Sequence, residues 1–205
     1  GRMDSVTFEV LRNAFQNIAE EMAITIRRSA YSTNIRTRGD FSCVLFDAQL
    51  RCLALSFGQP GHLVSMLKLV PAVVRERGGE MLPGEAVLCN DPYRGASHLN
   101  DITCISPLYL DGECIGYAAN MAHHVDVGGT FPTSLGVGKE IYHEGVIIPP
   151  TRIAADGRPD ENVLRLILEN FRAPRESEGD LKAQLAANHV ANRRVAEIFS
   201  RYGSP

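Results

Sequence analysis

The dipeptide Asp111-Gly112 lies between two apolar runs, residues 102–110 and residues 113–122. Asp-Gly is strongly preferred in the two-residue turns of β-hairpins, where both central positions need a positive φ. The sequence therefore predicts an antiparallel hairpin centred on this turn. A strict two-residue turn places Asp101 opposite Ala122 at the open end of the hairpin.

The spacing of apolar residues predicts the remaining elements. Apolar residues three and four apart indicate helices, and short apolar runs bounded by turn residues indicate strands. Helices are predicted over residues 6–30, 63–77, 162–171 and 180–202, and further strands over residues 42–46, 51–56 and 86–89. The predicted fold is α+β: a long N-terminal helix, antiparallel β-hairpins forming a β-rich middle, and C-terminal helices. Residues 1–155 are expected to form an α+β metal-site domain, and residues 156–205 a C-terminal helical segment, with residues 174–179 as a charged linker inside it.

Charge and cysteine usage narrow the class of protein. The formal net charge is −3 at pH 7 and the sequence pI is about 6.1, whereas nucleic-acid-binding domains usually have a pI above about 9. No apolar run approaches the roughly 20 residues that a membrane-spanning helix needs, and no signal-peptide pattern is visible. The five cysteines form an odd number without a CxxC pair, which favours free, buried thiols in a reducing compartment. We therefore expect a cytoplasmic protein that binds neither nucleic acid nor membranes.

Side chains that bind metals flank the open end of the predicted hairpin. The segment NDPYRGASHLNDI, residues 90–102, presents His98 and Asp101, and the second strand leads into His123, His124 and Asp126. Directly opposed residues of a hairpin have Cβ atoms about 4.5–5.5 Å apart, so the two groups of donors would meet. Imidazole nitrogen and carboxylate oxygen suit Zn, Mn, Fe or Ni better than Ca. The sequence therefore predicts one divalent metal site.

The sequence leaves open which of the two adjacent histidines binds the metal. Successive side chains of a strand point to opposite faces. A two-residue turn puts His124 on the face of Asp101, whereas a three-residue turn or a bulge selects His123. The other histidine and Asp126 would orient a ligand, and His124 or Asp126 would act as the catalytic groups that transfer protons.

A further histidine, His62, follows a glycine-proline loop and lies at the predicted N-terminus of the helix over residues 63–77. Exposed N–H groups at a helix N-terminus attract anions, so His62 could help to shape a binding site. Equally, it could only cap the helix or pack against it. Residues 32–40, which include Arg36, Arg38 and Asp40, likewise suit either a substrate loop or an ordinary surface loop.

In these motifs the chain resembles the hydantoinase B family, also called the HyuB-type family, which includes the B-type chain of N-methylhydantoinase. That family also includes the corresponding part of 5-oxoprolinase and a large subunit of acetone and acetophenone carboxylases. The resemblance rests on FEVLRNAFQNIAEEM (8–22), RSAYSTNIRTRGDFSCVLFD (28–47), GQPGHLVSM (58–66), NDPYRGASHLNDI (90–102), MAHHVDVGG (121–129) and EGVIIPP (144–150). Family members often have Gly-Gly-Thr where this chain has Gly95-Ala96-Ser97. They are also much longer, so the chain corresponds to an N-terminal portion.

The resemblance implies a metal-bearing subunit of an ATP-dependent cyclic amide hydrolase of the hydantoinase or 5-oxoprolinase type. It implies a hetero-oligomer with a HyuA-type partner that binds ATP and activates the small cyclic amide substrate by phosphorylation. The implied metal ligands are His98, Asp101 and His123, and the implied metal is Mn, Zn or Fe. Two alternatives remain: a subunit of an acetone carboxylase-type enzyme, and a non-catalytic assembly module.

Overall fold

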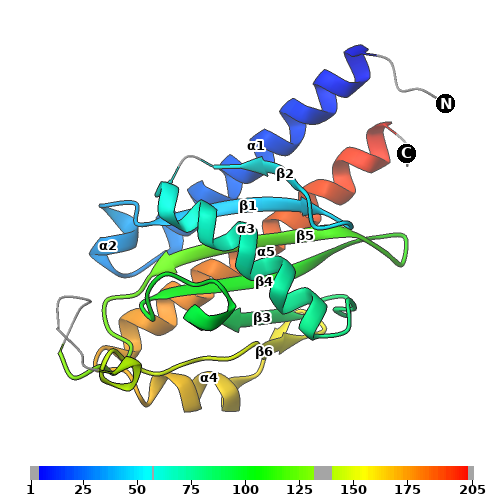
Figure 1. The fold of residues 1–205 in the computed structure, drawn as a ribbon. Helices are drawn as coiled ribbons and strands as arrows, with labels where there is room; N and C mark the ends of the chain where they lie inside the picture. Colours follow the sequence, from blue (N-terminus) through cyan, green and yellow to red (C-terminus); the bar gives the residue numbers. More distant parts are fainter. Residues whose placement is uncertain (1–4, 57, 132–139, 203–205) are drawn as a thin grey trace.

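The computed structural model describes residues 5–56, 58–131 and 140–202 (Figure 1). In chain order the elements are α1 (Ser5–Ser29), α2 (Thr33–Arg36), β1 (Phe41–Asp47), β2 (Cys52–Leu55), α3 (Pro60–Glu76), β3 (Ala86–Cys89), η1 (Pro92–Arg94), β4 (Asp101–Leu110), β5 (Glu113–His123), η2 (Ile141–His143), β6 (Thr151–Ala155), β7 (Arg158–Pro159), α4 (Glu161–Leu168) and α5 (Pro174–Tyr202). This arrangement confirms the predicted α+β class.

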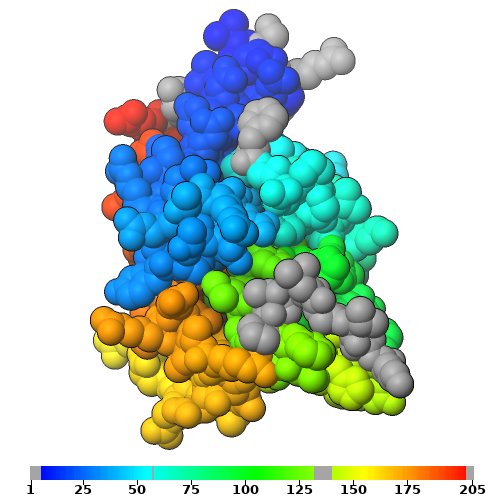
Figure 2. Space-filling view, turned by 90° about the vertical axis from the view of Figure 1, so that its left-hand side faces the viewer, coloured from blue at the N-terminus to red at the C-terminus, as the bar shows by residue number. Residues whose placement is uncertain are grey.

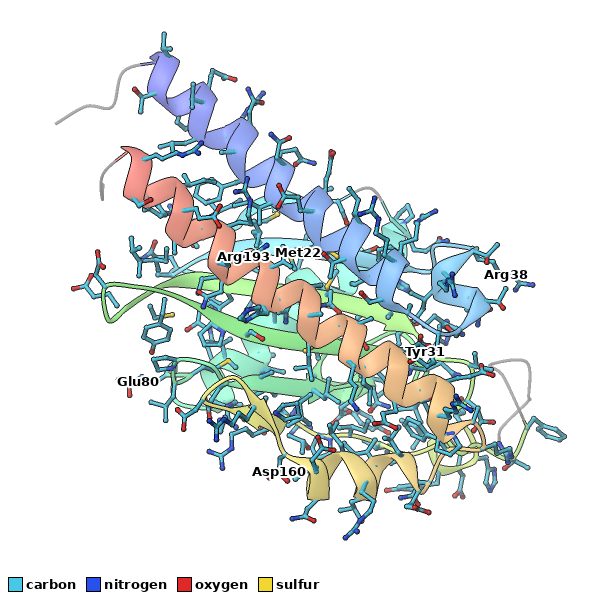
Figure 3. The ribbon with its side chains drawn as sticks, turned by 180° about the vertical axis from the view of Figure 1, so that it is seen from behind. Met22, Tyr31, Arg38, Glu80, Asp160 and Arg193 are labelled. Atoms are coloured by element: carbon cyan, nitrogen blue, oxygen red, sulfur yellow. The ribbon has the colours of Figure 1, made fainter. Side chains whose placement is uncertain are left out.

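One antiparallel sheet forms the centre of the molecule, with strand order β2-β1-β5-β4-β3-β6-β7. Helix α3 covers one face of the sheet (Figure 1), and α1, α5 and α4 cover the other (Figure 3). The predicted boundary after residue 155 falls in the turn between β6 and β7. Two hydrophobic clusters join residues from both sides of this boundary, so α5 and the sheet share their cores.

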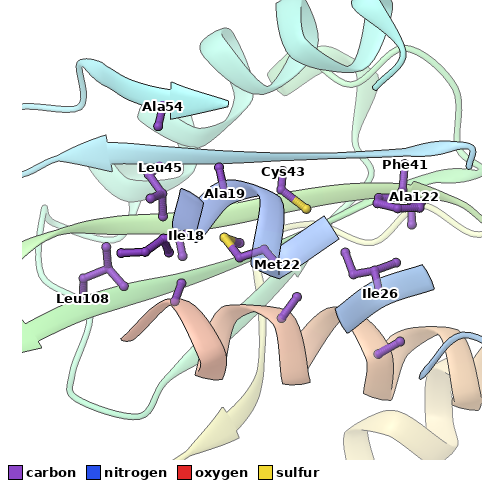
Figure 4. Packing of buried hydrophobic residues seen from close by; sticks show 14 of the residues in the cluster. Ile18, Ala19, Met22, Ile26, Phe41, Cys43, Leu45, Ala54, Leu108 and Ala122 are labelled. Carbon is purple, nitrogen blue, oxygen red and sulfur yellow. The ribbon is translucent and has the colours of Figure 1, made fainter. Parts of the chain in front are cut away.

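The long helices α1 and α5 pack against each other and against the sheet. Met22 of α1 is fully buried, together with a row of small residues on α5, Ala183, Ala187 and Ala191. Small side chains four residues apart lie on one face of a helix and allow close approach. Figure 4 shows Met22 among side chains of the sheet strands. The apolar stripe predicted for the first helix therefore forms part of the core.

The C-terminal part differs from the predicted fold in two places. Residues 174–179 are the first turns of α5 and not a linker, because Pro is favourable at a helix N-terminus. Gly179 fits there because a Cβ would lie 2.4 Å from the ring of Tyr31. The β6–β7 hairpin is not among the predicted elements, although its Asp156-Gly157 turn has the positive φ values of 49° and 73° that this dipeptide favours.

The β4–β5 hairpin forms around Asp111-Gly112 as predicted, and both turn residues have positive φ. Leu110 pairs with Glu113, as a two-residue turn requires, but the register shifts between Leu108 and Tyr109. A bulge inserts one extra residue into one strand, and every pair beyond it moves by one position. Asp101 therefore lies opposite His123, so the prediction that it faces Ala122 is wrong.

Among the residues that the structure describes, no helix combines the length and the apolar character that a membrane span needs.

Gly116 lies in β5 against the backbone of β1, and a Cβ at this position would be 2.2 Å from the Phe46 carbonyl oxygen. We expect Gly116→Ala to lower the free energy of unfolding by about 1–3 kcal/mol, because the strands would have to move apart. Gly61, in the first turn of α3, is the control. A Cβ there has no neighbour within 4 Å, so Gly61→Ala should stabilise the chain by about 0.5–1 kcal/mol. Urea unfolding of both variants measures the difference, and equal effects would contradict the argument.

All five cysteines are free thiols, but they differ in exposure. Burial raises the pKa of the Cys43 and Cys104 thiols to about 12 and that of Cys89 to about 11. Cys52 is exposed, contrary to the expected burial. Because the thiolate is the reactive form, we expect a thiol reagent at pH 8 to modify Cys52 first, and the three buried thiols only after unfolding. Mass spectrometry locates the modified residues, and Cys52→Ser should remove the fast phase.

Candidate metal centre

Four polar side chains from distant parts of the sequence meet at the open end of the β4–β5 hairpin. Asp101 begins β4 and lies opposite His123, the last residue of β5. The backbone N–H of His123 donates to the carbonyl oxygen of Asp40 at 3.0 Å, just before β1. His62 is the third residue of α3. Figure 2 looks onto this end of the molecule, where α2 (blue), α3 (cyan) and green segments of the hairpin region meet.

The Asp101 carboxylate is the centre of this cluster. His123 Nδ1 is 2.8 Å from Asp101 Oδ1, and His62 Nε2 lies 3.2 Å from the same oxygen. Asp40 Oδ1 lies 3.7 Å from His62 Nε2. One carboxylate oxygen therefore contacts two imidazoles, with a second carboxylate close to one of them.

These contacts change the acid–base properties of both partners. Burial by itself raises the pKa of the Asp101 carboxyl, but hydrogen bonds from His123 and His62 and their charges outweigh it and hold the pKa well below its usual range. Burial lowers the pKa of the His123 imidazole, but the hydrogen bond and charge of Asp101 and the charge of Asp40 raise it above its ordinary value. Asp101 is therefore ionised at neutral pH, which is the form that binds cations.

The loop that leads into Asp101 is held by buried amides. The side chain of Asn90 donates to the carbonyl oxygens of Leu99 (2.8 Å) and Val146 (2.9 Å) and accepts from the Ile148 N–H (2.6 Å). Asn100 donates from its side chain to the backbone oxygen of residue 124 at 2.9 Å. These bonds tie the loop to two other segments and set the position at which β4 begins.

His98 is exposed, and its backbone oxygen accepts a hydrogen bond from the Asp101 N–H at 3.0 Å. Within residues 5–56, 58–131 and 140–202, no group of three or more His, Cys, Asp or Glu side chains is arranged so that it could hold a metal ion. The donor atoms of Asp101 and His123 suit a divalent transition metal, but their present arrangement is a hydrogen bond. A metal bound by this pair would need a third ligand. The resemblance implies His98 for that role, and His98 lies three residues before Asp101 in the sequence.

The two residues predicted to transfer protons have other partners. His124 is fully buried on the α5 side, where its Nε2 lies 2.9 Å from Gln184 Oε1, and burial lowers its pKa. Asp126 accepts hydrogen bonds from the Gly128 N–H and from Arg172 Nη1, each at 2.7 Å. These contacts stabilise the fold around the cluster, and a role in proton transfer stays a prediction.

The sequence leaves Asp40 open between a substrate loop and an ordinary surface loop, and His62 open between a binding role and a packing role. Pairing of β1 with β5 carries Asp40 to the cluster, and α3 carries His62 there. Local patterns do not specify which distant strands pair. The only signal in the sequence was that both residues belong to polar, glycine-containing loops.

Comparisons with known proteins agree with this architecture. The Hydantoinase B/oxoprolinase family model matches residues 4–205. The 5-oxoprolinase of Dictyostelium discoideum is 38% identical over 98% of this chain, which spans 16% of that protein. The crystal structure of ATP-dependent caprolactamase from Pseudomonas jessenii has a TM-score of 0.92 and 33% identity over 99% of this chain and 35% of the other. A nucleotide-free acetone carboxylase structure has a TM-score of 0.89 at 22% identity, over 98% of this chain and 27% of the other, and shows the shared fold alone.

The match extends over nearly the whole chain, from the first helix through the hairpin to α5, although the chain spans about a third or less of these relatives. The six sequence segments that suggested a resemblance lie within the matched region. The chain therefore belongs to the Hydantoinase B/oxoprolinase family.

Proposed function

We propose that this chain is the metal-bearing part of a B-type subunit in an ATP-dependent cyclic amide hydrolase. Its relatives include 5-oxoprolinases, the beta subunit of a caprolactamase and the B-type chain of a putative D-/L-hydantoinase. Oxoproline, caprolactam and hydantoin rings all contain a cyclic amide bond. A small cyclic amide is therefore the substrate class that these relatives support.

The observation that carries the proposal is the contact between Asp101 and His123 at the open end of the β4–β5 hairpin. Asp101 Oδ1 lies 2.8 Å from His123 Nδ1 there. We assign the metal ligands to Asp101, His123 and His98, and the metal to Mn, Zn or Fe, because carboxylate and imidazole donors suit these ions. A divalent metal bound there would polarise a carbonyl group or supply hydroxide near neutral pH. The chain itself supplies an ionised, buried carboxylate beside an imidazole.

The ATP chemistry belongs to a partner in this proposal. The chain has no GxxxxGK[ST] loop that would bind nucleotide phosphates. The caprolactamase and hydantoinase relatives are each described as one subunit of an enzyme, which supports assembly with a second subunit. We assign ATP binding and activation of the ring to a HyuA-type partner.

The test uses the complete B-type subunit that contains this chain, purified together with its partner. Hydantoin, 5-oxoproline and caprolactam are offered with ATP, and ring-opened product is measured before and after removal of metal by a chelator. ATP-dependent ring opening that returns with Mn²⁺ supports the proposal. Fixation of bicarbonate onto a ketone would favour the carboxylase alternative. Full activity of the His98→Ala variant would contradict the proposed set of metal ligands.

A further inference from the structure

The segment that joins α1 to β1 carries four arginines, Arg27, Arg28, Arg36 and Arg38, which we call the arginine patch. We infer that the arginine patch is the surface on which this chain docks an acidic face of its partner subunit. This inference rests on the partner of the proposed function. It names the surface of this chain that meets that partner.

The first observation is the charge of this segment. Residues 22–39 contain four arginines and no aspartate or glutamate, in a chain whose formal net charge is −3. All four arginines are exposed. Within the described part of the chain none of them forms an ion pair with a carboxylate, whereas other exposed arginines such as Arg51 and Arg172 do. The patch therefore presents positive charge that a partner can neutralise.

Two carboxylates that contact this segment or directly follow it are engaged elsewhere. Asp180 Oδ1 accepts the backbone N–H groups of Tyr31 at 2.8 Å and Ser32 at 3.0 Å. Asp40 Oδ1 lies 3.7 Å from His62 Nε2. The fold therefore fixes the turn between α1 and α2 through its backbone and directs both carboxylates away from the arginine patch.

The arginine patch lies next to the candidate site. A Cβ at Gly39 would be 2.6 Å from Arg27 Nη2, so this guanidinium lies against the residue that precedes Asp40. The carbonyl oxygen of Asp40 in turn accepts a hydrogen bond from the His123 N–H at 3.0 Å. A partner docked on the patch would therefore lie beside the cluster around Asp101, where the proposed function needs the activated ring to arrive.

The residue types of this surface fit a protein partner better than a small molecule. Tyr31 is 60% exposed, and its ring lies against Gly179, where a Cβ would be 2.4 Å away. Figure 3 shows Tyr31 and Arg38 at the same end of the molecule. Tyr and Arg are enriched among the residues that carry the binding energy of protein interfaces, whereas small-molecule sites are concave and enclose most of the ligand. Complementary charge also steers the encounter of two proteins and fixes their orientation.

The experiment measures binding of the complete B-type subunit to its partner by isothermal titration calorimetry, at about 50 and about 300 mM NaCl. The test variant combines Arg36→Glu with Arg38→Glu. The control combines Arg158→Glu with Arg165→Glu, which reverses the charge of two exposed arginines in β7 and α4. We expect the test variant to bind about 10–100-fold more weakly at low salt, and the difference to shrink at high salt because ions screen exposed charges. The control should bind like the unchanged subunit.

Modification of arginines by phenylglyoxal, located by mass spectrometry, tests what covers the patch. Arg36 and Arg38 should react in the B-type subunit alone and be protected in the complex. Protection in the subunit alone would overturn the inference, because the rest of the subunit would then cover the patch. Equal affinities of the folded test and control variants would overturn it as well, with folding established by circular dichroism.

Ring opening at saturating partner separates docking from catalysis. The test variant should then reach the kcat of the unchanged complex. A lower kcat with unchanged affinity would overturn the inference, because the arginines would act on the substrate. An unchanged subunit that binds no partner would refute the partner of the proposed function, and the inference with it. A complex that forms but opens no cyclic amide would refute the proposed hydrolase alone, and the binding measurements would still decide the inference.

Discussion

Under the proposed function, replacement of Asp101 by alanine is expected to abolish Mn²⁺ binding and to reduce ATP-dependent ring opening by the complex of the B-type subunit and its partner. A catalytic metal contributes several kcal/mol of transition-state stabilisation, so the expected loss of kcat/KM is about 10²–10³-fold, at 1.36 kcal/mol for each factor of ten. Steady-state kinetics and metal analysis of the purified complex measure the two effects. Asp101→Asn, which keeps the shape of the side chain, should show the same loss.

The matched control is Asp111→Asn, at the other end of the same hairpin. Asp111 is exposed and has a φ of 50°, a conformation that Asn also adopts readily. This variant should keep its metal and its activity. A folded Asp101→Ala subunit that retains a full complement of metal would refute the proposed ligand set. Equal losses in the Asp101 and Asp111 variants would show that the effect arises from the hairpin and not from the site.

The largest expected effect on stability comes from Met22→Ala. Met22 is fully buried between α1, α5 and the sheet, and truncation of a buried Met to Ala costs about 2–5 kcal/mol through lost contacts and a new cavity. For a chain of this size, each kcal/mol lowers the Tm by about 2–4 °C. We therefore expect a fall in Tm on the order of 10 °C, measured by thermal unfolding followed by circular dichroism.

Ile24→Ala, two residues further along the same helix, is the control for Met22→Ala. Ile24 is 49% exposed, and substitutions on the surface usually change stability by no more than about 0.5 kcal/mol. The change in helix propensity is small and favours Ala. Similar falls in Tm for both variants would mean that α1 does not pack against the sheet and α5 through the face that includes Met22.

Much of the secondary structure followed from local patterns in the sequence. The Asp111-Gly112 turn predicted the central hairpin, because few residues tolerate positive φ at two successive positions. Apolar spacing predicted the long first helix within one residue at each end. It failed at residues 174–179, where high charge suggested a linker, although proline and acidic residues suit the first turn of a helix.

Within the candidate site, the sequence identified Asp101 and His123 as partners only through the resemblance to a family. Strict pairing from the turn favoured His124, and the bulge between the turn and the open end reversed that choice. The face on which each histidine lies depends on this single extra residue, since side chains alternate along a strand. The local sign of the bulge is Gly116, which follows the extra residue in β5, because a glycine inside a strand often marks a bulge or the close approach of another backbone.

The sequence by itself determined the central hairpin, most of each long helix, and the family to which the chain is similar. Only the tertiary structure brought Asp40 and His62 to Asp101 and turned His124 toward α5. The physical reason is that turns and helical stripes are local properties of a few adjacent residues. The pairing of β1 with β5 and the packing of α3 on the sheet are decided by burial of apolar surface from the whole chain.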